Sequence, residues 1–377
     1  MVRFIHTADW HLGMQAHSLP DEARVRFAQE RFDAVRRIAK LAGDEGCAFV
    51  VVSGDVFDSN HVDRAVVAKA IEALSAFTVP VFMLPGNHDP LGPASVYRTE
   101  GWTDRKPANV EVLSRFDPIA VPGADGVEVI GAPWHTKHQL VDPLAAAYEG
   151  ASSAGAGLRV VVGHGIVDEL NPDSDDPSAI RAEGMRAALR DEVVHFVALG
   201  DRHSVTEIPD TDGRAWYSGT QLSSDYGELE PNDVLLVELH PDGCNVERRT
   251  VGTWVFEVQD FDLNSEGDVE TLEQWLDAVE SKHTTAVKLA LRGTLSLAAS
   301  AKLDDLLERN RLTFASLNTW QRHTDLVVAP DDADLAGLDV SGYVREALEE
   351  LRTEAAQSGE EAGAARDALN LLYRLAR

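Results

Sequence analysis

The segment FVVVSGD, residues 49–55, carries the pattern that decides the fold: an apolar run that ends in a glycine and a carboxylate. A short continuous apolar run of this kind is typical of a strand that is buried on both faces. Similar runs occur at 2–6, 80–84, 127–131, 160–163 and 196–199. Apolar residues at helical spacing lie between several of them, as in 21–42 and 62–77. Alternating strands and helices predict a layered α/β domain.

Polar residues of one chemical kind follow these runs. They are Asp9-Trp10-His11, Gly54-Asp55, Gly86-Asn87-His88-Asp89, Gly163-His164 and Gly200-Asp201-Arg202-His203. Functional groups of α/β domains gather just past the carboxyl ends of strands, so we expect these side chains to converge. Carboxylate and amide oxygens mixed with imidazoles suit Mn, Fe or Zn. The sequence therefore predicts a two-metal centre that promotes in-line attack on a phosphate ester, with Asp55 as the ligand shared by both ions.

The composition limits the class of protein. The chain has 377 residues, of which 44% are hydrophobic and 26% charged, values that fit a globular protein of more than one domain. No apolar run reaches the roughly 18 residues of a membrane span, the N-terminus has no signal-peptide pattern, and the two cysteines form no disulfide or metal motif. We therefore expect a cytoplasmic protein with no membrane contact.

The net charge of −29 is unusual for a protein that binds nucleic acid, because such proteins usually present a basic face. Any contact with DNA must then come from a local basic patch or from bound metal ions.

The pattern changes along the chain, and three segments are expected. Residues 1–257 form the α/β domain. Residues 258–335 show two helical and two strand-like stretches, which predict a small α+β domain. Residues 336–377 follow an acidic, glycine-containing linker and have helical periodicity. This tail is interpreted either as an ordinary terminal helix or as a segment that docks a partner.

The motifs in this order resemble those of the calcineurin-like metallophosphoesterase superfamily. The segments HTADWHLG at 6–13, SGDVFDSN at 53–60 and YSGTQ at 217–221 are most similar to its SbcD/Mre11 nucleases and the related YhaO-type exonucleases. The resemblance implies a β-sandwich flanked by helices over residues 1–257 and a cap domain at 258–335. It also places the helical tail where relatives carry a segment that binds their partner.

The resemblance also implies a role for each motif residue. One ion would be held by Asp9, His11, Asp55 and His203, and the other by Asp55, Asn87, His164 and Asp201. His88 would be the catalytic imidazole beside the leaving oxygen. Asp58 matches a position near the substrate that is often histidine in the family, so it is interpreted as substrate-binding or as a surface turn residue.

Asp201 departs from the family pattern, which has histidine at this position. It is expected to ligate the second ion directly, to bind it through water, or to leave that ion weakly held. Two divalent ions carry a charge of +4, the family's two carboxylates reduce it to +2, and Asp201 reduces it to +1. A less positive centre acidifies water less, which predicts a higher pH optimum and a preference for harder ions.

The function implied by the resemblance is a metal-dependent DNA exonuclease or endonuclease in DNA repair. It implies two divalent ions, with Mn favoured over Fe, Mg or Zn, a homodimer, and an SbcC/Rad50-like coiled-coil ATPase as partner. The alternatives are a small-molecule phosphodiesterase or phosphatase with the same metals, and a catalytically weak scaffold protein.

Overall fold

Residues 49–55 form the expected strand and the turn after it. Strand β2 spans Phe49–Val52 and pairs in parallel with β1 (Val2–Thr7) on one side and β3 (Val81–Met83) on the other. All four of its side chains are buried, which explains why the run contains only apolar residues. The structure, a computed structural model, describes residues 1–152, 157–171, 176–229, 231–328, 342–355, 357, 362–365, 368–369 and 371–372.

Two six-stranded sheets build the unit that comprises residues 1–18 and 24–254. Their orders are β12-β11-β1-β2-β3-β4 and β5-β6-β7-β8-β10-β9. The further strands are β4 (Val110–Val112), β5 (Ile119–Ala120), β6 (Val127–Gly131), β7 (Leu158–His164), β8 (Phe196–Gly200), β9 (Thr206–Glu207), β10 (Ala215–Tyr217), β11 (Asp233–His240) and β12 (Gly243–Thr250). Strands β1 to β4 run parallel, as do β6, β7, β8 and β10, so the carboxyl ends within each set share one edge of their sheet.

The two sheets pack face to face through large apolar side chains. Phe4 and Phe49 of the first sheet stack with ring centroids 4.7 Å apart, and Phe196 of the second sheet meets Phe4 edge-on at 5.5 Å. Val160 and Val162 of β7 belong to the same buried cluster. The predicted sandwich is therefore confirmed.

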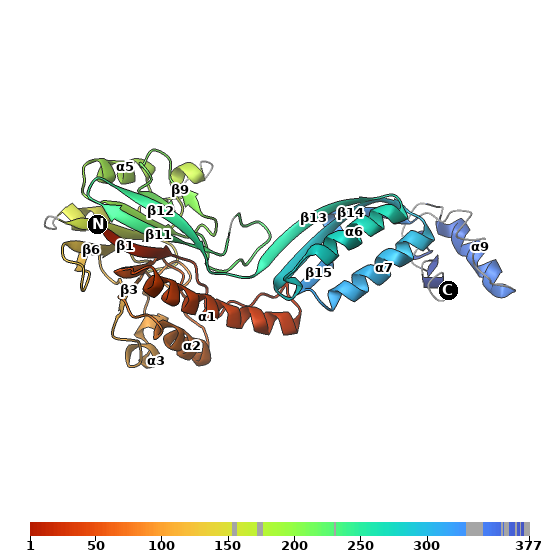
Figure 1. Cartoon of the computed structure of the whole chain (residues 1–377), viewed down its shortest axis with the longest axis horizontal. Coiled ribbons are helices and arrows are strands. Elements are labelled where there is room, and N and C mark those ends of the chain that lie inside the picture. Colours follow the sequence, from red (N-terminus) through yellow and green to blue (C-terminus); the bar gives the residue numbers. More distant parts are fainter. Residues whose placement is uncertain are drawn as a thin grey trace. The chain divides into compact units, whose positions relative to one another are not determined.

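Helices cover the outer faces of both sheets, as the sequence predicts (Figure 1). Helices α1 (Asp21–Asp44) and α2 (Arg64–Leu74) bury their apolar stripes against the first sheet, and α4 (Ala145–Ser152) and α5 (Ala182–Arg190) cover the second. Short helical turns complete this unit: η1 (Val96–Arg98), α3 (Glu100–Thr103) and η2 (Asp168–Leu170).

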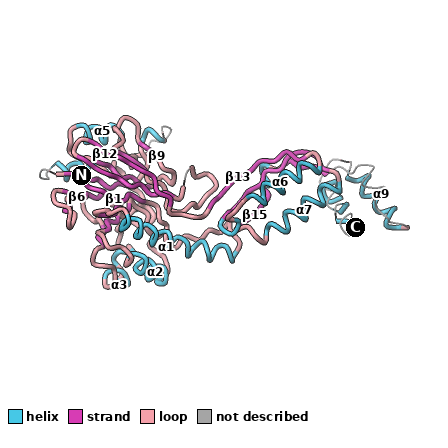
Figure 2. The backbone as a smooth tube through the Cα atoms, viewed as in Figure 1, coloured by secondary structure: helices cyan, strands magenta, loops and turns pink. Residues whose placement is uncertain are grey.

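The second unit, residues 19–23 and 255–377, contains a four-stranded parallel sheet beside two helices (Figure 2). Strand β14 (Thr285–Leu295) pairs with β13 (Val255–Leu263), β15 (Ser316–Thr319) and β16 (Asp325–Val328). Helices α6 (Glu266–Ala278) and α7 (Leu297–Arg311) share an apolar core with these strands. Each of the two helices begins after a serine whose hydroxyl accepts a backbone N–H, Ser265 from Asp268 and Ser296 from Ala299.

Both helices and both strands predicted for 258–335 are present, and β13 and β16 are additional. The remaining elements are η3 (Lys282–Thr284), η4 (Gln321–His323) and α9 (Tyr343–Ala355). The division at 257/258 stays a prediction, and the predicted boundary at 335/336 lies outside the described residues. Among the described helices, none combines the length and the apolarity that crossing a bilayer requires.

His6 links the two sheets and gives the fold a pH dependence. Its Nε2 donates to the carbonyl of Leu199 at 3.0 Å, and its Nδ1 is buried without a partner among the described residues. Burial lowers the pKa of His6 from 6.5 to about 3. Between pH 6.5 and about pH 3, His6 binds a proton in the unfolded chain but stays neutral in the folded chain. The contribution of His6 to the free energy of unfolding is therefore fully present above pH 6.5. It falls by about 1.4 kcal/mol per pH unit as the pH drops from 6.5 towards 3.

We expect His6→Gln to remove this slope, because the amide still has an N–H for Leu199 but binds no proton. Urea unfolding at pH 7 and pH 5 measures it, with the exposed His138 changed to Gln as control. If wild type and His6→Gln lose the same stability between these pH values, His6 is not the group responsible.

Candidate metal centre

Five strand ends bring the seven predicted ligands together. Asp9 and His11 follow β1, Asp55 follows β2, Asn87 follows β3, His164 ends β7, and Asp201 and His203 follow β8. Backbone hydrogen bonds join these loops: the N–H of Asp9 donates to Gly54 O at 3.1 Å, and the N–H of Gly165 donates to Gly200 O at 3.1 Å. Two further bonds cross between the sheets: His164 Nδ1 donates to Ser53 O at 2.8 Å, and Asp201 N donates to Asp9 Oδ1 at 3.1 Å. The two sheets thus contribute to one site.

Asp9, His11 and His203 form the first group of side chains that can hold one ion. Nε2 of His11 lies 3.2 Å from Nε2 of His203. Two neutral imidazole nitrogens at this distance either share one proton or direct their lone pairs at a common cation. Asp9 is fully buried beside them, so its carboxylate needs positive charge nearby.

The second group is built around His164. Its Nδ1 donates to Ser53 O at 2.8 Å, and its Nε2 faces Asn87 Oδ1 at 2.8 Å, Asp55 Oδ2 at 3.4 Å and Asp201 Oδ1 at 3.6 Å. If the Asn87 amide is turned over, its N–H group instead donates to His164 Nε2 and to Asp55. The orientation with the oxygen inward is the one that suits a cation shared by Asn87 and His164. Asp9 also lies within reach of this group, together with Asp55.

The backbone is strained where the carboxylates are placed. Asp9, His11, Asp55 and Asp201 have φ values of 53°, 42°, 51° and 96°. They are half of the eight non-glycine residues with positive φ in the described chain. Such conformations cost free energy and persist where the surrounding structure imposes them, often at functional sites.

Burial and charge at the centre act in opposite directions on its titrating groups. Burial alone lowers the pKa of His164, but the carboxylates of Asp55, Asp201 and Asp9 raise it well above its usual value. Burial raises the pKa of Asp9, while that of Asp55 is lowered because His164, His11 and His88 surround it. Without a cation, protons held on His164 and Asp9 must therefore balance the charge of the neighbouring carboxylates. Divalent ions would replace those protons.

The donor set fits two such ions. It offers carboxylate and amide oxygens together with imidazole nitrogens, the mixture that borderline divalent metals prefer. Asp55 is within 4 Å of histidines in both groups, with Oδ2 3.9 Å from His11 Nε2 and 3.4 Å from His164 Nε2. This position fits the predicted role of Asp55 as the shared ligand.

Gly86 is the glycine of the GNHD motif, and it leaves space for Asp55. A Cβ at this position would lie 2.1 Å from Asp55 Oδ1 and 2.6 Å from its backbone nitrogen. We expect Gly86→Ala to displace the carboxylate and lower hydrolysis by about a hundredfold or more, as misplacing a reacting group by an ångström does. The matched control is Gly43→Ala on α1, where a Cβ meets nothing within 4 Å. Equal rates for both variants on a phosphodiester would disprove the packing argument.

His88 and Asp58 lie at the exposed rim of the centre. His88 Nδ1 donates to Asp58 O at 2.9 Å, and its ring meets that of His11 edge-on with centroids 4.8 Å apart. The Asp58 carboxylate is 3.5 Å from His11 Nδ1 and about a third exposed. Donor atoms of His11, Asp58 and His88 are also close enough together to hold an ion.

Three residues around the centre carry contacts that the motifs do not reveal. Asp89 fixes the GNHD loop by accepting from Gly86 N at 2.8 Å and Tyr97 Oη at 2.5 Å. Arg31 is fully buried on α1 and donates to Trp10 O at 2.7 Å. Glu228 accepts from His203 Nδ1 at 2.9 Å. Asp89 stands inside a motif and could have been noticed there. The helical spacing places Arg31 on the apolar stripe of α1 with Phe27 and Val35, whereas no spacing or periodicity distinguishes Glu228.

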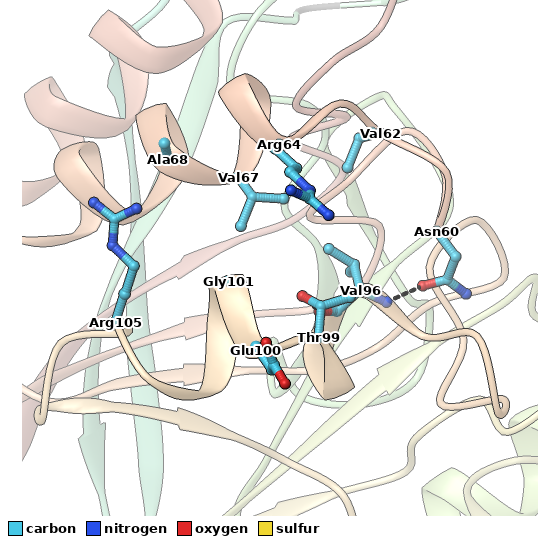
Figure 3. A pocket seen from close by; sticks show the side chains of 10 residues that line it. All are labelled: Asn60, Val62, Arg64, Val67, Ala68, Val96, Thr99, Glu100, Gly101 and Arg105. Carbon is cyan, nitrogen blue, oxygen red and sulfur yellow. Dashed lines mark hydrogen bonds between the residues drawn. The ribbon is translucent and has the colours of Figure 1, made fainter.

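A separate pocket of about 510 Å³ lies between α2 and the segment η1–α3 (Figure 3). Val62, Val67 and Val96 form apolar walls, and Arg64 and Arg105 stand at its sides. Asn60 ties the segment together, because its Oδ1 accepts from Val96 N at 2.8 Å. No predicted ligand lines this pocket, so it is not part of the metal centre.

A sandwich with oxygen and imidazole donors at its strand ends defines a metal-dependent phosphoesterase. Residues 2–205 match the family model described as calcineurin-like phosphoesterase, which is 204 of the 377 residues. The chain belongs to this family. Enzymes of the family work with a dimetal centre, and the candidate ligands described above are of the chemical kinds that such a centre requires.

Named relatives cover most of the chain at modest identity. The DNA double-strand break repair protein Mre11 of Haloferax volcanii is 27% identical over 93% of this chain and 74% of its own length. The SbcD component of the nuclease SbcCD from Bacillus subtilis is 25% identical over 64% of this chain and 67% of its own. The metallophosphoesterase YhaO of the same organism is 24% identical over 81% of this chain and 76% of its own length. Among solved structures, a dimetal phosphatase from Danio rerio is 12% identical and has a TM-score of 0.39. The match covers 65% of this chain and 98% of the phosphatase, and it is too distant to support an argument.

Proposed function

We propose that this chain is a DNA nuclease of the SbcD/Mre11 type that acts in DNA repair. The observation that carries the proposal is the convergence of seven ligand residues, from both sheets, on one partly exposed centre. The Mre11 and SbcD relatives favour DNA as the substrate over other phosphate esters. A DNA substrate agrees with the cytoplasmic location that the composition predicts.

Each residue of the centre is given a role in this proposal. One ion would be held by Asp9, His11, Asp55 and His203, and the second by Asp55, Asn87, His164 and Asp201. When bound, two divalent ions, with Mn²⁺ favoured, supply positive charge that stabilises the reacting phosphate and acidifies the attacking water. Asp58 borders the substrate at the rim of the centre.

His88 is the candidate proton donor. Because its Nδ1–H is engaged with Asp58 O, Nε2 is the ring nitrogen that is left to contact a substrate. In the charged ring, Nε2 holds a proton that can pass to the leaving 3′ or 5′ oxygen of the cleaved strand. Asp58 orients the ring through its backbone carbonyl.

The implied partners belong to the same proposal. An SbcC/Rad50-like coiled-coil ATPase would bind the tail, and two copies of this chain would form a homodimer. The segment from 336 onward would then be the docking part, with α9 as its described helix. Light scattering of the purified chain, alone and with a coiled-coil ATPase of this type, tests both associations.

Cleavage of linear duplex DNA with Mn²⁺ tests the function itself. Bis-p-nitrophenyl phosphate and cyclic nucleotides are assayed beside it, and Asp55→Asn serves as the inactive control. The nuclease proposal expects DNA to be the better substrate at low salt, where phosphate contacts are strongest. Hydrolysis of the small esters with intact DNA would contradict it.

That contrary result would favour a small-molecule phosphodiesterase or phosphatase. The observation behind this alternative is the net charge of −29, which repels a polyanion more than it repels a small ester.

The aspartate at 201 is expected to set the pH optimum. Its carboxylate is about a third exposed, which leaves room for a larger side chain, and Oδ1 lies 3.6 Å from His164 Nε2. Asp201→His makes the loaded centre more positive by one charge, so we expect its pH optimum to fall and its tolerance of softer metals to rise. Asp201→Asn removes the charge without adding an imidazole and separates the two effects. Overlapping pH–rate profiles for all three proteins would end this explanation.

A further inference from the structure

Glu228 is a buried carboxylate that reaches the metal centre from outside its motifs. Its side chain is 6% exposed, and Oε1 accepts from His203 Nδ1 at 2.9 Å. His203 is one of the two histidines of the first group, and its other nitrogen, Nε2, is the atom that faces His11. Glu228 therefore touches a proposed ligand at the atom turned away from the ion.

Hydrogen bonds to residues other than His203 also hold the Glu228 carboxylate in place. Oε1 also accepts from Ser224 Oγ at 2.6 Å, and Oε2 accepts from Ser224 N at 2.8 Å and Ser223 Oγ at 3.1 Å. The next residue, Leu229, donates its N–H to Ser204 Oγ at 2.9 Å. The position of this carboxylate is thus set from two segments, 223–224 and 204, so it can impose an orientation on the ring of His203.

The chemical consequence follows from the two nitrogens of an imidazole. A proton held on Nδ1 by a carboxylate leaves the lone pair on Nε2, fixes the plane of the ring and makes Nε2 a stronger donor to a cation. We propose that Glu228 is a positioning residue that presents His203 Nε2 to the first ion and makes that ion the more tightly held of the two. This inference rests on the proposed function, because it requires a divalent ion at the centre.

The other two histidines show why the effect is specific to one ion. His164, on the second ion, has its Nδ1 bonded to the neutral carbonyl of Ser53. His11 has the Asp58 carboxylate at 3.5 Å, farther away and about a third exposed. Among these three rings, His203 alone has a buried carboxylate hydrogen-bonded to its Nδ1, the nitrogen that faces away from the proposed ion.

The test is a Mn²⁺ titration of the metal-free full chain, followed by electron paramagnetic resonance of free Mn²⁺. We expect Glu228→Gln to weaken one of two bound ions by about ten- to a hundredfold and to leave the other unchanged. Glu228→Asp keeps the charge and is expected to retain part of the lost affinity. Glu247→Gln removes an exposed carboxylate on β12 and is expected to match wild type. Melting temperatures show whether each variant is folded.

The outcomes separate this inference from the function. Wild-type protein that binds no Mn²⁺ would contradict the proposed function itself. Two ions in wild type with unchanged affinities in Glu228→Gln would overturn the role of Glu228 alone. Equal weakening of both ions would overturn it as well, because it would indicate a general disturbance and not the loss of a positioned His203.

Discussion

Replacing Asp55 with asparagine is expected to abolish phosphoester hydrolysis and to weaken both ions together. Asp55 is the carboxylate that approaches histidines of both groups, at 3.9 Å from His11 Nε2 and 3.4 Å from His164 Nε2. Its Oδ1 also accepts from His88 N at 2.9 Å, which holds it in place. Asparagine has the same shape, but it lacks the negative charge that keeps two divalent ions side by side. We expect the rate to fall at least about a thousandfold, equivalent to roughly 4 kcal/mol of transition-state stabilisation.

The measurement is hydrolysis of bis-p-nitrophenyl phosphate at saturating Mn²⁺, with bound metal determined by elemental analysis. The matched control is Asp63→Asn, an exposed aspartate before α2 whose side chain makes no capping bond. The control is expected to bind two ions and keep wild-type activity. Asp55→Asn protein that still holds two ions and hydrolyses the ester at a comparable rate would show that Asp55 does not bridge them.

The strands of the sandwich could be predicted because continuous apolar runs of this length are compatible with few other structures. Residues 49–52 are apolar at every position since β2 is covered on both faces, and that condition is visible without a structure. The ligands Asp9, Asp55 and Asn87 could be placed by a similar argument, because parallel strands deliver the residues that follow them to one edge. Sequence order and sheet geometry together are enough to assemble this part of the centre.

The supporting residues could not be predicted in this way. The contact between Glu228 and His203 depends on the path of the loop at 223–229, and loop paths are set by hydrogen bonds such as that of Leu229 N to Ser204 Oγ. Arg31 lies on the buried stripe of α1, four residues from Phe27 and from Val35, although arginine is almost never fully buried unless it is paired. The positive φ values of Asp9 and Asp55 also leave no mark in the sequence, because aspartate tolerates this conformation without requiring it.

His88→Ala is expected to lower DNA cleavage by about 10²- to 10⁴-fold while leaving both ions bound. The side chain lies at the exposed rim, where Nδ1 donates to Asp58 O and the ring meets that of His11 edge-on. The backbone N–H that supports Asp55 is retained by alanine. The variant should therefore lose the proton donor without disturbing the shared ligand, which is the reverse of what Asp55→Asn does.

The choice of substrate sharpens this expectation. Protonation matters most when the leaving oxygen is a poor leaving group, as the deoxyribose oxygen is, and little when it is p-nitrophenolate. The loss for His88→Ala should then be much larger on DNA than on bis-p-nitrophenyl phosphate, and His61→Ala, an exposed histidine three residues after Asp58, should affect neither. Equal losses on both esters would assign His88 to stabilising charge on the phosphate instead of protonating the leaving oxygen. Loss of a bound ion would make His88 a ligand, together with His11 and Asp58, since their donor atoms are close enough for that arrangement.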